Sequence, residues 1–248
     1  MGRFEGRVAL ITGGGRGIGA ATAQLFAAEG ASVAVCDMDQ GPAQEVAGPL
    51  GDRGLAIACD VTRREQVEAA VQKAVERFGK LDILVACAGI TRDNLVHKMS
   101  DEDWDGVIDT HLKGSFLAAQ AAQKVMVPNR YGKIVLLSST SALGNRGQTN
   151  YTTAKAGLQG MARTLAIELG PFSINVNVVA PGFIETRMTE ATAKRMGLDW
   201  EDFKKAAAEH TPLRRTGQPI DIANAIAFFC SDESSFISGQ TLYVRGGP

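Results

Sequence analysis

A tyrosine and a lysine that could exchange a proton lie four residues apart, in the segment Asn150–Lys155. If the segment is helical, Tyr151 and Lys155 share one face of the helix. A tyrosine has an ordinary pKa of ~10, and a neighbouring positive charge stabilises the phenolate and lowers that pKa. The pair therefore predicts a general acid/base that protonates a carbonyl oxygen or deprotonates an alcohol. Considered alone, the same spacing is also common for an ordinary pair on a helix surface.

Two serines end the apolar run that precedes this segment. Ser138 and Ser139 follow Lys133–Leu137, which has the composition of a buried strand. A hydroxyl group at this position can donate a hydrogen bond to the same carbonyl oxygen and polarise it. Both serines are therefore candidates for the group that anchors the substrate.

Glycines cluster near the start of the chain, which has 28 of them in total, more than the usual ~7% of residues. The loop Thr12–Gly19 follows the first apolar run and precedes a helical pattern. Glycines let the backbone turn sharply and approach a pyrophosphate, and a helix N-terminus offers free N–H groups to it. This context is the one that a dinucleotide-binding loop requires, although the spacing TGxxxGxG differs from GxGxxG.

Asp37, which ends the second apolar run, favours NAD over NADP. A carboxylate there can accept hydrogen bonds from both ribose hydroxyls of an adenosine, and it would repel a 2′-phosphate. Arg16 is the contrary signal, because an arginine in the glycine loop can hold a 2′-phosphate or lie over the adenine. Asp60, after the third run, is placed either to contact the adenine amino group or, like Thr62, to cap the next helix.

The elements that would position these residues alternate between short apolar runs and longer segments of helical period. Runs without polar alternation are typical of strands buried on both faces of a sheet. The pattern therefore predicts a Rossmann-type, doubly wound parallel sheet of seven strands. The sheet and its helices would form one α/β domain, residues 1–248. The expected strands are Arg7–Ile11, Ser32–Cys36, Leu55–Cys59, Leu81–Val85, Lys133–Leu137, Ile174–Val179 and Thr241–Val244. The expected helices are Gly17–Glu29, Gln40–Pro49, Arg63–Phe78, Ser100–Val127, Thr149–Leu169 and Pro219–Ser231. Residues 183–216 interrupt the alternation, and their polar, helix-favouring centre predicts an insertion that covers the substrate.

Composition excludes several classes of protein. The 26 basic and 27 acidic residues give a net charge of -1, which argues against nucleic acid or an anionic membrane as a partner. No apolar run approaches the ~18 residues of a membrane span, and the N-terminal residues do not form a signal peptide, so a cytoplasmic protein is expected. The four cysteines lack metal-ligand or disulfide spacing, which predicts no metal site.

The whole chain resembles the short-chain dehydrogenase/reductase family in its TGxxxGIG loop, the aspartate after the second strand, the Ser–Tyr–Lys set and Ala180-Pro181-Gly182. Three further segments, 89–95, 147–151 and 178–186, resemble the 3-oxoacyl-[acyl-carrier-protein] reductase branch. The resemblance implies an NAD(P)-dependent enzyme that interconverts a carbonyl and a secondary alcohol, with a 3-oxoacyl thioester as substrate. It implies Tyr151 as general acid/base, one of the serines as carbonyl anchor, and Lys155 on the nicotinamide ribose. The expected cofactor-binding residues are Gly13, Arg16, Gly17, Ile18, Gly19, Asp37, Asp60, Val61, Ala88, Gly89, Tyr151, Lys155, Pro181, Gly182, Ile184 and Thr186.

Several positions depart from the family pattern. His111 stands where the family has an asparagine that holds a proton-relaying water; a histidine can also hold water and titrates near neutrality, or it can simply pack. Cys87 replaces an asparagine after the fourth strand, and a buried inert thiol is favoured there over a redox sensor. The loop before Tyr151 is one residue short, so matching the strand favours Ser139 and counting back from Tyr151 favours Ser138. A loop absorbs a deletion more easily than a strand does, so Ser139 is the expected catalytic serine.

The partner and assembly are also implied by the resemblance. An acyl-carrier protein is acidic, and the segment 124–133 carries Lys124, Arg130 and Lys133 without an acid, which fits either a docking patch or a solvated face. The second docking arginine of the branch is replaced by Phe172, and a homotetramer is expected. Asp37 and Phe172 also fit an NAD-linked dehydrogenase of another small secondary alcohol. A nucleotide-binding subunit with impaired catalysis is the alternative from a different class.

Overall fold

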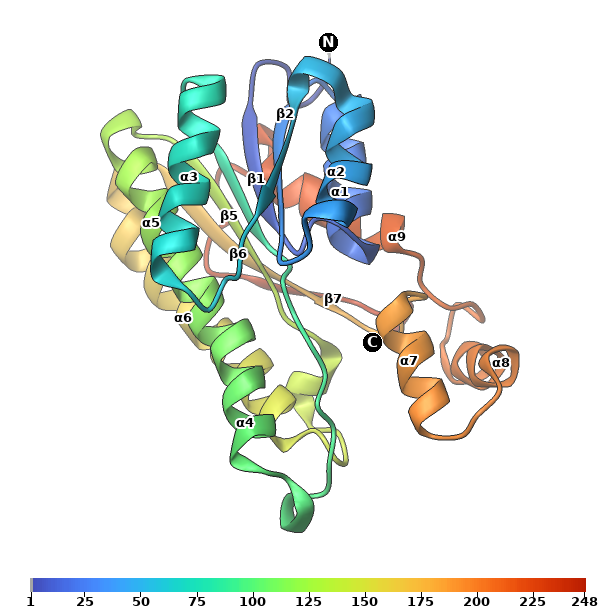
Figure 1. Cartoon of the computed structure of the whole chain (residues 1–248). Coiled ribbons are helices and arrows are strands. Elements are labelled where there is room, and N and C mark those ends of the chain that lie inside the picture. The colour runs from blue at the N-terminus through green and yellow to red at the C-terminus, as the bar shows by residue number, and fades with distance from the viewer. Residues whose placement is uncertain (1) are drawn as a thin grey trace.

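The computed structural model describes residues 2–248, which contain one parallel sheet of seven strands in the order β3-β2-β1-β4-β5-β6-β7 (Figure 1). The strands are β1 (Val8–Thr12), β2 (Ser32–Asp37), β3 (Gly54–Ala58), β4 (Ile83–Ala86), β5 (Gly132–Leu137), β6 (Ile174–Pro181) and β7 (Thr241–Val244). Every residue of β1, β4 and β5 is buried, because helices cover both faces of the sheet. The predicted fold class and strand number are confirmed.

Helices pack on both faces and divide the core in two. One face is covered by α3 (Arg64–Phe78), α5 (Gly114–Asn129) and α6 (Thr149–Leu169), with residues such as Val71 and Leu158 in the core. The other face is covered by α1 (Gly17–Ala28), α2 (Gln40–Ala47) and α9 (Pro219–Cys230), with Phe26 and Ile226 in the core. This arrangement places the carboxyl ends of all seven strands at one edge, where open α/β sheets bind their ligands.

The helix that was predicted over Ser100–Val127 is divided into three parts. It begins as α4 (Asp101–Ile108), widens into a π-helical turn, η3 (Asp109–Lys113), and continues as α5. The prediction of one regular helix was wrong because a π turn has no signature in the hydrophobic period. Such turns are frequent at functional sites, and this one holds His111 in the interior, where the side chain is 1% exposed.

The segment after β6 forms two helices beyond the carboxyl ends of the strands, α7 (Arg187–Arg195) and α8 (Trp200–His210). The helical pattern expected between them is interrupted at Gly197, which has a φ of +69° and ends the first helix. Phe183, Trp200 and Phe203 pack together and attach α8 to the end of β6. Figure 1 shows α7 and α8 on one side of the strand ends and α4 on the other.

Within residues 2–248, no helix combines the length and the apolar character that crossing a membrane would require.

Candidate active site

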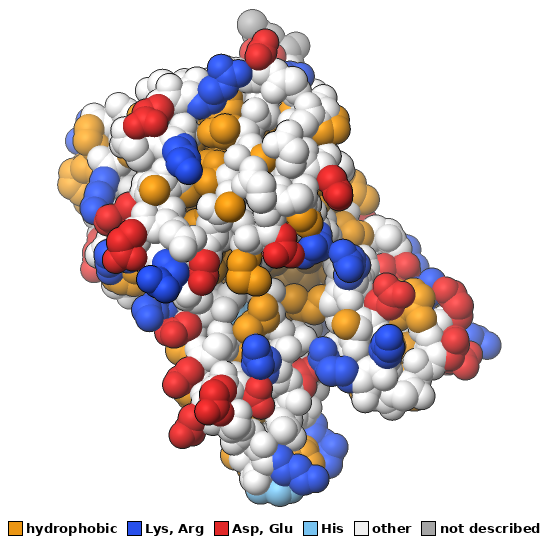
Figure 2. All heavy atoms as spheres, in the orientation of Figure 1, with side chains coloured by type: hydrophobic (Ala, Val, Ile, Leu, Met, Phe, Trp, Pro, Cys, Tyr) orange, Lys and Arg blue, Asp and Glu red, His pale blue; other side chains and the backbone are white. Residues whose placement is uncertain are grey.

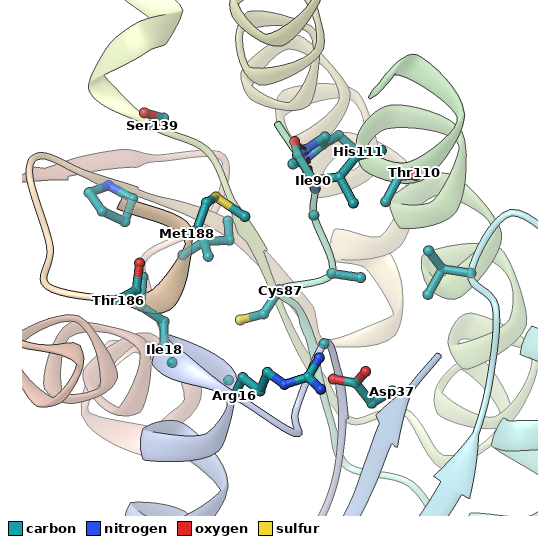
Figure 3. A pocket seen from close by; sticks show the side chains of 18 of the residues that line it. Arg16, Ile18, Asp37, Cys87, Ile90, Thr110, His111, Ser139, Thr186 and Met188 are labelled. Atoms are coloured by element: carbon teal, nitrogen blue, oxygen red, sulfur yellow. Dashed lines mark hydrogen bonds between the residues drawn. The ribbon is translucent and has the colours of Figure 1, made fainter. Parts of the chain in front are cut away.

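A large pocket lies at the carboxyl ends of the strands, between α4 and α7 (Figure 2). Its volume is about 390 Å³. Every residue that the sequence predicted for the site lines this pocket, whether it belongs to the glycine loop, the strand ends, α6 or the segment after β6. Figure 3 shows Arg16 and Asp37 at one end of the pocket and Ser139, Ile90 and His111 at the other. The two ends would accommodate the two halves of a dinucleotide.

The glycine loop is shaped for close approach of a ligand. Gly13 has a φ of +62°, and a Cβ atom there would lie 2.7 Å from the Cα of Ala88. A Cβ atom at Gly19 would lie 2.2 Å from the carbonyl oxygen of Gly13. Side chains at either position would therefore displace the backbone. Arg16, the N-cap residue of α1, makes no side-chain cap, so the first N–H groups of α1 remain available to an anion. These residues fit a dinucleotide cofactor.

Two carboxylates occupy the adenosine end of the pocket. Asp37 accepts hydrogen bonds from the Gly15 N–H at 3.1 Å and from the Asp39 N–H at 3.2 Å. Asp39, which the sequence reasoning missed, also lines the pocket and forms an ion pair with Arg16 at 3.0 Å. The guanidinium of Arg16 is thus paired already, and the end of the pocket has two negative charges for one positive charge.

Asp60 lines the pocket but does not cap α3. Its carboxylate accepts hydrogen bonds from the N–H and the hydroxyl of Thr62, at 2.9 and 2.8 Å. The N-cap residue of α3 is Arg63, without a side-chain cap, so the capping alternative for Asp60 and Thr62 was wrong. The local turn that Asp60 makes with Thr62 satisfies the carboxylate instead.

The environment of Tyr151 favours the neutral phenol. Burial raises the pKa of Tyr151 to about 12, a hydrogen bond with Ser139 opposes that rise, and the carboxylate of Asp93 adds to it. The ring of His111 meets the ring of Tyr151 edge to face, with centroids 5.1 Å apart. The chain by itself therefore raises this pKa, contrary to the direction expected from Lys155 alone. A phenolate at neutral pH would require the additional positive charge of an oxidised nicotinamide.

Lys155 is buried below Tyr151 with its Nζ 5.4 Å from the centre of the tyrosine ring. It donates a hydrogen bond to the carbonyl oxygen of Leu137 at 2.5 Å. Burial lowers the pKa of Lys155 to about 7, because a buried ammonium has lost its water. Lys155 therefore exchanges a proton near neutrality, which suits a group that passes protons to Tyr151.

The two serines have different surroundings. Ser138 is 2% exposed; its hydroxyl donates to the carbonyl oxygen of Lys155 at 2.8 Å and accepts from Gln159 at 3.2 Å. Ser139 accepts from the N–H of Ser141 at 3.1 Å and directs its hydroxyl group to Tyr151. Ser138 thus joins the end of β5 to α6, whereas Ser139 is the serine whose hydroxyl group acts on Tyr151.

We predict that the two serines respond differently to replacement by alanine. Ser139→Ala should lower kcat about 100-fold, as the loss of one donor to a reacting oxygen does. Ser138→Ala should keep kcat within about threefold and cost about 1 kcal/mol of unfolding free energy, since it removes a buried hydrogen bond. Steady-state kinetics and urea unfolding measure the two effects. A loss of kcat confined to Ser138→Ala would reverse the assignment.

His111 is buried and Cys87 is half-buried, and the charge of Lys155 acts on the pKa of both side chains. Nε2 of His111 lies 3.0 Å from the N–H and 2.8 Å from the carbonyl oxygen of Ile90, and its Nδ1 has no partner among the described residues. Burial and the charge of Lys155 hold the pKa of His111 well below its ordinary value. This direction disfavours the titration near neutrality that the residue type of His111 suggested. Burial raises the pKa of Cys87 to about 12, so the thiol is protonated, as expected of an inert cysteine.

Several pocket residues were not found from the sequence. Ile90, Thr110, Met188 and Thr189 belong to the loop after β4, to η3 and to α7, which meet only in the folded chain. Their positions one to three residues from predicted site residues were the only available signal. The remaining ones are Met38, Asp39, Cys59, Cys87, Leu137 and Arg187.

The basic segment 124–133 does not form a free cationic patch. Lys133 is 2% exposed and donates to Asn175, and Lys124 forms an ion pair with Glu68 at 2.8 Å. Arg130 donates to the carbonyl oxygen of Pro171. Of the three cations, therefore, only Arg130 keeps an exposed charge without a carboxylate partner in the described structure.

Comparison with known proteins gives consistent results. A family model described as enoyl-(acyl carrier protein) reductase matches residues 13–248. The chain is 44% identical to the short-chain reductase protein NovJ of Streptomyces niveus, over 97% of this chain and 93% of that protein. It is 43% identical to the 3-oxoacyl-[acyl-carrier-protein] reductase FabG of Escherichia coli (98% of each chain) and 43% identical to FabG of Thermotoga maritima (99% of this chain and 98% of that protein).

Proposed function

Because this chain belongs to the short-chain dehydrogenase/reductase family and is an NAD(P)-dependent oxidoreductase acting on CH–OH groups, we propose that it reduces 3-oxoacyl thioesters to 3-hydroxyacyl thioesters. The proposal rests on one observation: Ser139, Tyr151 and Lys155 line the same pocket as the glycine loop. The names of the 3-oxoacyl reductases among its relatives support the choice of substrate.

The proposed roles follow from the contacts of each side chain. A nicotinamide cofactor, held by the glycine loop and Asp37, would supply or accept the hydride when bound. Ser139 donates a hydrogen bond to the carbonyl oxygen, and Tyr151 delivers the proton that the oxygen gains in reduction or removes it in oxidation. Lys155, with its pKa of about 7, returns a proton to Tyr151. His111 packs against the tyrosine ring and limits its orientation.

For the cofactor, we propose NAD as the preferred form, although NADP is chemically possible. The 2′-phosphate of NADP would meet the carboxylates of Asp37 and Asp39, and Arg16 is already paired with Asp39. The negative charges of the phosphate and the carboxylates would repel each other. Because these groups are partly exposed to water, the repulsion energy is limited to ~1–2 kcal/mol. The proposal concerns the adenosine end alone and does not depend on the identity of the substrate.

We predict a dissociation constant about tenfold lower for NADH than for NADPH. Asp37→Asn should reduce the preference, and Asp39→Asn should improve the binding of NADPH by releasing Arg16. Quenching of protein fluorescence or enhancement of NADH fluorescence gives the constants. Asp105→Asn, a carboxylate on α4 that does not line the pocket, is the matched control. Tighter binding of NADPH by the wild type would contradict the proposal.

The substrate is tested by a panel read at 340 nm with each cofactor. Acetoacetyl thioesters of an acyl-carrier protein, coenzyme A and a short thiol test the proposed reaction and its carrier, and simple ketones test the alternative of another small secondary alcohol. A 2-enoyl thioester tests the reaction that the description of the family model names. We expect turnover of the 3-oxoacyl thioesters and none of the enoyl thioester. If no arm of the panel shows turnover, the nucleotide-binding subunit becomes the better reading.

We further propose that residues 183–216 cover the substrate, since Met188 and Thr189 of α7 line the pocket beside the proposed nicotinamide end. The acyl-carrier partner, the homotetramer and the cytoplasmic location stay predictions.

A further inference from the structure

An ion pair joins α7 to the loop that follows β4. Arg195, the last residue of α7, donates through Nη2 to Asp93 Oδ2 at 3.2 Å and to the hydroxyl of Thr91 at 3.2 Å. The same Nη2 also donates to Thr192, one turn earlier on α7, at 3.0 Å, which directs the guanidinium. Side chains 102 residues apart in the sequence are thus joined at the substrate end of the pocket.

The two segments that this ion pair joins border the pocket from opposite sides. Ile90, next to Thr91, lines it from the loop after β4, and Met188 and Thr189 line it from α7 (Figure 3). Ala193 is the one buried residue within α7, so this helix has little apolar contact of its own to hold it in place. A side-chain contact across the pocket therefore matters more for α7 than for helices packed on the sheet.

The loop, in contrast, is firmly attached to the helix that carries Tyr151. Asn150 is fully buried and donates to the carbonyl oxygens of Arg92 and Asp103, both at 3.0 Å. The same side chain accepts the N–H of Tyr151 at 2.7 Å. Asp93 is consequently held near the start of α6, and any group that binds Asp93 is positioned relative to Tyr151.

The negative charge of the Asp93 carboxylate has few partners in the described structure. Its side chain is 20% exposed, and its Oδ1 is buried with no hydrogen-bond partner in residues 2–248. Its negative charge acts on Tyr151 and contributes to the raised pKa of the phenol. Arg195 supplies the only ion pair that Asp93 makes in the described structure.

We propose that Arg195 and Asp93 form a latch that holds α7 over the substrate end of the pocket and fixes the Asp93 carboxylate beside Tyr151. Both are positioning residues, because neither lines the pocket that holds the reacting groups. The effect on proton transfer rests on the proposed role of Tyr151, whereas the effect on α7 does not.

Titratable side chains near Tyr151 and Lys155 come from several elements. Lys155 lies on the same helix, His111 on η3, Cys87 at the end of β4 and Asp93 in the following loop. Asp93 is the one carboxylate among them. Its replacement by asparagine removes a negative charge that disfavours the phenolate, so the pKa of Tyr151 falls. In the direction of alcohol oxidation, which needs the phenolate, the acid limb of the pH–rate profile should then move to lower pH.

The test of the latch compares Arg195→Ala with Lys194→Ala. Lys194 is the adjacent exposed cation on α7 and forms no ion pair within the described part of the chain, which makes it a matched control. Amide hydrogen exchange of residues 187–195 reports the attachment of α7 without any turnover.

We expect Arg195→Ala to speed this exchange about fivefold and to raise KM about fivefold. The value of kcat should stay within twofold, because only one partly exposed ion pair is lost. Arg195→Lys should recover part of both effects. Exchange that is unchanged in Arg195→Ala would overturn the proposal.

Asp93→Asn completes the test. It should loosen α7 in the same direction as Arg195→Ala does. The double variant should be no looser than Arg195→Ala alone, because that variant already removes the contact with Asp93 together with the hydrogen bond to Thr91. Asp93→Asn alone should displace the pH–rate profile to lower pH. If the effects of the two substitutions on amide exchange are additive, the latch is overturned. If Tyr151→Phe inactivates the enzyme but Asp93→Asn leaves the pH–rate profile unmoved, the link between the latch and Tyr151 is overturned. If the thioester panel shows no turnover, the exchange cycle still decides whether the latch exists.

Discussion

Tyr151→Phe is expected to lower kcat by a factor of about 1,000, within the range that a positioned acid/base contributes. The variant lacks the phenol hydroxyl group that we propose donates a proton to the carbonyl oxygen and receives one from Lys155. Phenylalanine fills nearly the same volume, and the edge-to-face contact with His111 is retained. The loss should therefore appear in catalysis and not in folding.

The measurements are the initial rate at 340 nm and the dissociation constant of the reduced cofactor. The cofactor constant should stay within about threefold of the wild-type value, since the glycine loop and Asp37 are untouched. Tyr243→Phe serves as the control, because this tyrosine contacts Gln159 and lies outside the pocket. A Tyr151→Phe enzyme that keeps more than a tenth of its activity would remove Tyr151 from the mechanism.

Lys155→Met should abolish turnover and at the same time make the protein more stable at neutral pH. Lys155 has a folded-state pKa of about 7 against ~10.5 for an exposed lysine, so the folded state binds fewer protons than the unfolded state between these values. Each pKa unit corresponds to ~1.4 kcal/mol, and the buried ammonium therefore costs a few kcal/mol below pH 7. The variant also loses the hydrogen bond to Leu137, which is worth ~1–2 kcal/mol, so the net gain is about 3 kcal/mol.

The pH dependence of the unfolding free energy shows whether the buried ammonium of Lys155 causes this gain in stability. The depressed pKa of Lys155 makes wild-type stability rise as the pH increases from about 7 toward 10, because a proton-free lysine no longer opposes folding. Lys155→Met lacks this contribution, so its advantage should disappear near pH 10. Urea unfolding at pH 6.5, 8 and 9.5 measures the difference in slope, with Lys194→Met as an exposed control. Parallel pH profiles for wild type and Lys155→Met would show that Lys155 is not desolvated as the structure indicates.

Much of the architecture was predictable from the sequence because its signals are local. Continuous apolar runs such as Lys133–Leu137 identify strands buried on both faces, and all seven were found within two residues of their ends. The glycine spacing in Thr12–Gly19 reflects contacts within one turn and the start of one helix. The i, i+4 spacing of Tyr151 and Lys155 places both on one face of α6, where the structure has them. Each of these features depends on residues that are close to one another in the sequence.

Other features were decided only by the tertiary structure. Ser138 and Ser139 differ by one position, and the packing of β5 against α6 turns one hydroxyl into the core and the other toward Tyr151. Lys133 looked like a surface charge and is buried, because its position in β5 places its side chain against Asn175 on β6. A residue type does not reveal how much water the fold removes from it.

The depressed pKa of Lys155 and the pairing of Arg195 with Asp93 have the same origin. Both depend on which segments meet at the carboxyl edge of the sheet, and those segments are far apart in the sequence. The sequence alone determined the fold class, the cofactor loop and the candidate acid/base, since periodicity and spacing encode them. Burial and contacts across the pocket set the charges and positions of these groups, because desolvation and long-range pairing exist only in the folded chain.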